Sequence, residues 1–76
     1  MTVNEILDSC RTVHSAFTSR GIDPVLVVVE IEDRVFDMMR ASPILMKHAH
    51  TGYGFALDPK TKKAYFDIEG IRFLRG

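Results

Sequence analysis

This sequence has little of what usually stabilises or identifies a very small protein. It has no tryptophan and a single cysteine, Cys10, so no disulfide can form within the chain. Ten basic residues balance ten acidic ones, and the whole molecule therefore has no long-range attraction for nucleic acid or an anionic membrane. It has no apolar run near the ~20 residues that span a bilayer and no secretory signal. We therefore expect a soluble, cytoplasmic protein that does not bind membranes.

What the chain does have is a hydrophobic content of 46% in 76 residues, which is enough for an ordered domain. Its length allows a single small globular domain over residues 1–76. A domain of this size buries only roughly 60% of the surface of its unfolded chain. Without disulfides, it needs either very efficient packing or self-association.

The first twenty residues carry the pattern of an amphipathic helix. Thr2 and Glu5 have the spacing of a capping box, in which each side chain bonds to the backbone N–H of the other residue. Gly21 is a typical residue just past the end of a helix. These signals predict a helix over about 3–20. Its apolar stripe consists of Val3, Ile6, Leu7, Cys10, Val13 and Phe17.

The next segment allows two interpretations. Asp23-Pro24 is a helix-start signal, and polar residues then recur on one helical face, which predicts a second helix over about 24–41 and hence a helical hairpin. The β-branched residues of 25–31 instead favour a strand followed by a helix over 32–41, with that strand at the centre of the fold. We prefer the helix because its pattern persists for seventeen residues. Its polar face would hold Glu30, Asp33, Arg34, Asp37 and Arg40.

The C-terminal half changes from helical to alternating periodicity. Ser42-Pro43 repeats the helix-start signal and predicts a short third helix over 43–50. Alternating apolar residues then predict strands over about 53–58, 63–69 and 71–74. The predicted fold class is therefore α+β, in which the helical hairpin packs on an antiparallel β-hairpin or three-stranded sheet.

No pattern in the chain indicates catalysis or a cofactor. The serines lie on the first helix without an activating motif, so we predict that the protein is not an enzyme and binds no cofactor. A Cys-His₃ metal site is one alternative, although the usual zinc spacings are absent. Its ligands would be Cys10, His14, His48 and His50.

Nucleic-acid binding is another alternative. Lysines cluster at the predicted hairpin tip, and Lys47 lies on the predicted third helix. Three helices followed by a basic hairpin resemble the outline of a winged helix-turn-helix protein, which implies DNA contacts from the third helix and the hairpin. We rank this function second, because the third helix is mostly apolar and the net charge is zero. The residues concerned are Lys47, Lys60, Lys62 and Lys63.

The function that we predict first is a small non-enzymatic protein-protein interaction or assembly module that forms a homo-oligomer. The predicted second helix has more apolar surface than one neighbour covers, and the last strand has an edge that is open to pairing. The partner is then another protein or a second copy of the chain. The interface candidates are Val35, Phe36, Met39, Phe73 and Leu74.

Overall fold

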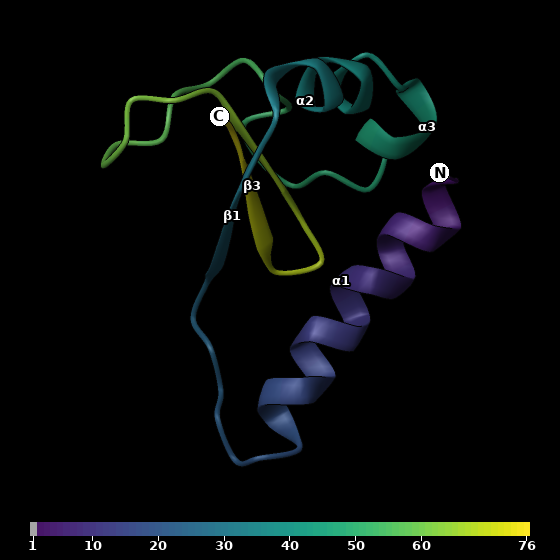
Figure 1. Ribbon diagram of the computed structural model, residues 1–76, viewed down its shortest axis with the longest axis vertical. Helices are drawn as coiled ribbons and strands as arrows, with labels where there is room; N and C mark the ends of the chain where they lie inside the picture. The colour runs from purple at the N-terminus through teal and green to yellow at the C-terminus, as the bar shows by residue number, and fades with distance from the viewer. Residues whose placement is uncertain (1) are drawn as a thin grey trace.

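The computed structural model describes residues 2–76 and has an α+β fold (Figure 1). No helix among these residues has the length and hydrophobicity needed to cross a membrane. The strands form one mixed sheet in the order β1-β3-β2, with β1 parallel and β2 antiparallel to β3. In chain order the elements are α1 (Val3–Thr18), β1 (Val27–Ile31), α2 (Asp33–Arg40), α3 (Pro43–Met46), β2 (Tyr65–Ile68) and β3 (Ile71–Arg75).

Helix α1 begins where the sequence predicts. The Thr2 hydroxyl accepts a hydrogen bond from the Glu5 N–H at 3.2 Å, and the Glu5 carboxylate accepts one from the Thr2 N–H at 3.0 Å. This capping box satisfies two of the N–H groups that a helix start leaves without partners. The helix ends at Thr18, two residues before the predicted end.

The prediction of one helix over 24–41 is wrong. Residues Val27–Ile31 form a strand, and only Asp33–Arg40 are helical. The β-branched side chains decided the conformation because the extended chain can pair with β3, from Val27 opposite Ile71 to Ile31 opposite Arg75. The alternative interpretation named the right elements, but β1 lies at an edge of the sheet and β3 at its centre.

Two further elements differ from the prediction. Helix α3 stops at Met46, so the predicted helix over 43–50 has only its first turn. The predicted strand over 53–58 is absent because Gly52, Tyr53 and Gly54 all have positive φ angles of 79°, 50° and 86°, which turn the chain out of the extended conformation.

The predicted strands over 63–69 and 71–74 are confirmed as β2 and β3, which pair with each other as a hairpin. The hairpin predicted between 53–58 and 63–69, with the lysines at its tip, is wrong, because only an isolated bridge between Leu57 and Ala64 forms there. The two-residue turn between β2 and β3 consists of Glu69 and Gly70, and both have positive φ angles, as the twist of a tight hairpin requires. The sheet as a whole is mixed and not antiparallel, because β1 runs parallel to β3.

The main core lies between the three helices and one face of the sheet. Phe66 is at its centre, with its ring centroid 5.0 Å from that of Phe36 on α2 and 5.2 Å from that of Phe73 on β3. Helix α1 contributes only Leu7 and Cys10 to the fully buried residues of this core. The long N-terminal helix is therefore held by few buried side chains.

Candidate protein interface

The outer edge of β2 is covered by the chain itself. The segment over residues 49–56 runs along this edge and satisfies its backbone groups. Strand β2 therefore offers no free backbone groups of Tyr65 or Asp67 to another chain. The bonds run from the His50 N–H to the Asp67 oxygen (2.9 Å), Asp67 N–H to Thr51 (3.2 Å), Gly54 N–H to Tyr65 (2.8 Å) and Tyr65 N–H to Ala56 (3.1 Å).

The outer edge of β1 is open. The Val27 N–H donates to the Gly70 oxygen at 3.4 Å, and the Ile31 oxygen accepts from the Gly76 N–H at 2.8 Å, so the odd-numbered residues bond towards β3. Neighbouring residues of a strand direct their N–H and C=O groups to opposite sides. Val28 and Glu30 therefore direct theirs outwards, where no strand within residues 2–76 pairs with them. Figure 1 shows β1 at the margin of the fold.

The side chains of this edge are apolar and exposed. Val28 is 51% and Val29 37% exposed, although β1 belongs to the sheet. The connection that leads into β1 adds the exposed side chains of Ile22, Val25 and Leu26. Clustered exposed apolar side chains of this kind mark interaction surfaces more often than scattered ones do. We call the residues 22–30 the β1 edge surface.

Strand β1 is also poorly packed on both of its faces. On the helix side, a groove of about 290 Å³ separates α1 from the sheet and is lined by Val13, Val29 and Phe73, among others. On the opposite side, a hollow of about 360 Å³ lies between Val28 and the loop over residues 58–61. The strand therefore has free apolar surface on both faces and a free backbone edge.

The structure places the predicted interface residues in two groups. Phe36, Met39 and Leu74 are buried within the chain, so they cannot form a surface for a partner, and this part of the prediction is corrected. Phe36 and Met39 on α2 belong to the core on one face of the sheet, and Leu74 is buried on the other face. Val35 and Phe73 are half-buried and line the groove beside β1.

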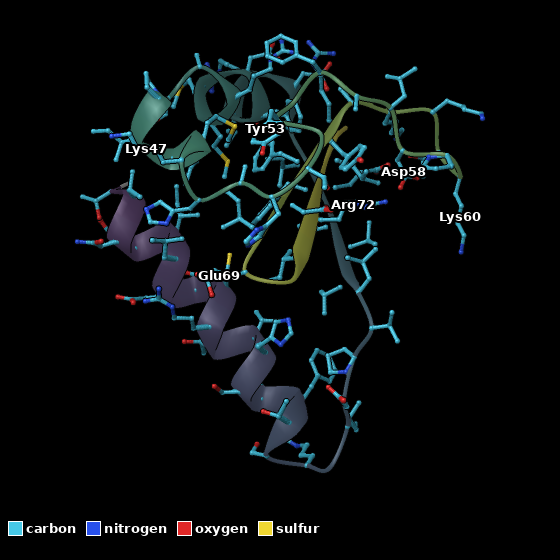
Figure 2. The ribbon with its side chains drawn as sticks, turned by 180° about the vertical axis from the view of Figure 1, so that it is seen from behind. Lys47, Tyr53, Asp58, Lys60, Glu69 and Arg72 are labelled. Carbon is cyan, nitrogen blue, oxygen red and sulfur yellow. The ribbon has the colours of Figure 1, made fainter. Side chains whose placement is uncertain are left out.

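The lysines proposed for nucleic acid do not form one surface. Figure 2 places Lys47 and Lys60 on opposite sides of the molecule. The Lys63 ammonium forms an ion pair with the Glu30 carboxylate, which neutralises it, and Lys62 is exposed in the same loop. Helix α3 has a single turn, which is too short to act as a recognition helix in a groove of DNA.

The residues proposed for metal binding are also dispersed. Within residues 2–76, no three His, Cys, Asp or Glu side chains come close enough to hold a metal ion. Cys10 is buried in the core, and burial raises the pKa of its thiol. His14 packs against the Gly70 turn, while His48 and His50 are exposed after the end of α3.

A charged cluster that the sequence does not indicate lies on the second face of the sheet (Figure 2). Arg72 of β3 donates two hydrogen bonds to Asp67, at 2.8 and 2.9 Å, and one to Asp58 at 2.8 Å. Its guanidinium carbon also lies 4.2 Å from the centroid of the Tyr65 ring. Because two carboxylates already neutralise Arg72, the cluster offers no free charge for an anionic ligand. It anchors the loop that follows Asp58 to the sheet.

Asp58 organises this loop. It accepts hydrogen bonds from the backbone N–H groups of Thr61 at 2.9 Å and Lys60 at 3.1 Å, in addition to that from Arg72. The Thr61 N–H and the Arg72 guanidinium lower the pKa of Asp58 to about 2. The register of β2 against β3 puts Asp67 opposite Arg72 on one face, but Asp58 reaches them only through the folded loop.

In comparisons with known proteins, no family model, no curated protein and no solved structure matches this chain. Among the features described above, the β1 edge surface combines an open backbone edge with exposed apolar side chains.

Proposed function

We propose that this protein is a small non-enzymatic interaction and assembly module that self-associates through the β1 edge surface. The observation that supports this most strongly is the difference between the two edges of the sheet. Hydrogen bonds from residues 49–56 cover β2, whereas no strand within residues 2–76 pairs with the outward groups of Val28 and Glu30.

Monomeric proteins usually protect an open edge with a lysine, a proline or a β-bulge. Strand β1 has none of these. Its five residues pair with β3 in unbroken register, and Glu30 is its only charged residue. The charge of Glu30 is already paired with Lys63, so the strand lacks even a free charge that would repel a second copy.

Self-association would add to the stability that the small core provides. Helix α1 has sixteen residues, yet only Leu7 and Cys10 of them are fully buried. Any partner that binds the folded state and covers apolar surface adds to the stability of that state. A second copy on the β1 edge surface would bury Val28 and Val29, which the single chain leaves exposed.

Light scattering after size exclusion, over a range of concentrations, tests this function. Pairing of five-residue strands is small beside the ~1,600 Å² of a standard interface, so we expect a monomer–dimer equilibrium that shifts with concentration. Val29→Lys should move the equilibrium to monomer, because a lysine on an edge strand opposes pairing. A molecule that stays monomeric at every concentration would refute self-association.

The matched control is Ile44→Lys. Ile44 is also an exposed apolar residue, but it lies on α3, away from β1. It introduces the same charge and should leave the equilibrium unchanged. If both lysine variants dissociate the oligomer equally, general charge repulsion and not the β1 edge explains the loss.

A further inference from the structure

We propose that two copies of this chain pair antiparallel through β1, about a two-fold axis that passes beside Val29. This inference rests on the proposed function and adds the partner and the register to it. It follows from which backbone groups of β1 are free and from which side chains the pairing would place opposite each other.

The direction of the pairing follows from symmetry. Homo-oligomers mostly have closed symmetry, and a two-fold interface uses the same surface on both copies. A two-fold axis perpendicular to the sheet brings the two β1 edges together antiparallel. In an antiparallel ladder, two opposite residues can exchange both of their hydrogen bonds. Identical edges can therefore satisfy each other fully.

The register follows from the outward-facing residues. Val28 and Glu30 are the residues of β1 whose backbone groups point away from β3. With Val29 on the axis, Val28 of each copy pairs with the partner's Glu30, and both residues of both strands form their hydrogen bonds. An axis at Glu30 would require Glu32 opposite Val28, and Glu32 follows the strand as the N-cap of α2. An axis at Val28 would require Leu26, which precedes the strand.

The side chains are compatible with this register. Val29 meets the partner's Val29 on the helix side of the sheet, at the groove between α1 and β1. Val27 meets the partner's Ile31 on the same side, so this side of the contact is wholly apolar. On the other side, Glu30 lies opposite the partner's Val28 and keeps its own ion pair with Lys63.

The result is a continuous sheet in which no edge remains open. The two three-stranded sheets join through β1, and the outer strands are the two copies of β2. Residues 49–56 already cover the β2 edge in each copy. The dimer is therefore closed, and further copies cannot add to it by strand pairing.

Disulfide cross-linking tests the register. In a Cys10→Ala background, Val29→Cys places two thiols at a pair whose Cα atoms are ~4.5 Å apart, within the range that a disulfide bridges. The matched control is Val28→Cys, which is more exposed than Val29 but would lie about 7–8 Å from its equivalent. We expect Val29→Cys to cross-link at least roughly tenfold faster.

The outcomes separate this inference from the function on which it rests. If Val28→Cys cross-links faster, the axis lies at Val28 and the register is refuted. If the chain dimerises but neither thiol cross-links, β1 is not the contact, and this inference fails while self-association stands. If the chain stays monomeric in light scattering, the proposed function itself fails.

A second cross-link guards against a misfolded Val29→Cys variant. A mixture of Val27→Cys and Ile31→Cys chains should form a disulfide heterodimer, because these residues are opposite in the same register. Each variant alone should cross-link slowly. Circular dichroism of every variant establishes that the fold is retained, and equal yields from the mixture and from the single variants would refute the register.

Discussion

Replacement of Arg72 by methionine should destabilise this protein more than the loss of an ordinary surface charge. Arg72 joins Asp58 and Asp67 on the second face of the sheet by three hydrogen bonds of 2.8 to 2.9 Å. Its side chain is only 19% exposed. Methionine keeps the length of the side chain but leaves the half-buried Asp67 carboxylate without its cation.

The magnitude lies between two known limits. An exposed ion pair contributes about 0–1 kcal/mol, whereas removal of one partner from a buried pair costs ~3–5 kcal/mol. The Arg72 cluster is mostly but not fully buried, so we expect Arg72→Met to lower the free energy of unfolding by about 2–3 kcal/mol at pH 7. In a domain of this size the Tm should fall by roughly 10 °C or more.

The same reasoning predicts a pH dependence. Burial raises the pKa of Asp67, but hydrogen bonds from Arg72 and Thr51 outweigh it, so the pKa lies below its usual value. The pKa of Asp58 is lowered to about 2. Carboxyls with a depressed pKa in the folded state stabilise it above the unfolded pKa of ~3.9, and this contribution is lost as the pH falls towards 2. The difference in the free energy of unfolding between wild type and Arg72→Met should therefore be smaller at pH 2 than at pH 7.

Urea unfolding followed by circular dichroism at pH 7 and pH 2 measures both effects. The control is Arg34→Met, because the Arg34 side chain is 82% exposed and lies 3.7 Å from Glu32. Arg34→Met should lower the free energy of unfolding by less than about 0.5 kcal/mol at either pH. The reasoning is refuted if Arg72→Met costs no more than Arg34→Met at pH 7, or if its cost is unchanged at pH 2.

Two further predictions concern the attachment of α1. Gly70→Ala would place a Cβ 2.2 Å from the His14 Nε2 at a φ of +77°, whereas Gly21→Ala has the same strain at a φ of +76° but no neighbouring atom within 4 Å. Thermal unfolding should show that Gly21→Ala lowers the free energy of unfolding by about 1–2 kcal/mol and that Gly70→Ala lowers it more. Equal decreases for the two variants would mean that α1 does not hold His14 against the turn. Cys10 is buried and burial raises its pKa, so iodoacetamide labelling followed by mass spectrometry should be slow in buffer and fast in urea. Equally rapid labelling in both conditions would show that α1 detaches from the sheet.

The sequence by itself determined the elements whose signals are local. The capping box of Thr2 and Glu5 begins α1, because both partners lie within one helical turn. The alternation on either side of Gly70 specifies the strands β2 and β3, because alternation is a property of each segment by itself. These elements, together with the α+β class, follow from short-range physics.

The tertiary structure alone decided the conformation of residues 24–41. The polar periodicity that predicted a helix there is real within α2, but only Glu30 extends it backwards into β1. The strand forms because β3, about forty residues later in the chain, provides a parallel partner from Ile71 to Arg75. A pattern within one segment cannot reveal a partner so far away in the sequence.

The tertiary structure also decided which residues form the candidate interface. Strand order, which no local pattern encodes, places β1 at an edge and buries Phe36 and Leu74, which the sequence had proposed for a surface. It likewise assembles Arg72 with Asp58 from a loop fourteen residues away. Local signals identify which segments can be helices or strands, whereas exposure depends on how distant segments compete to cover the same surface.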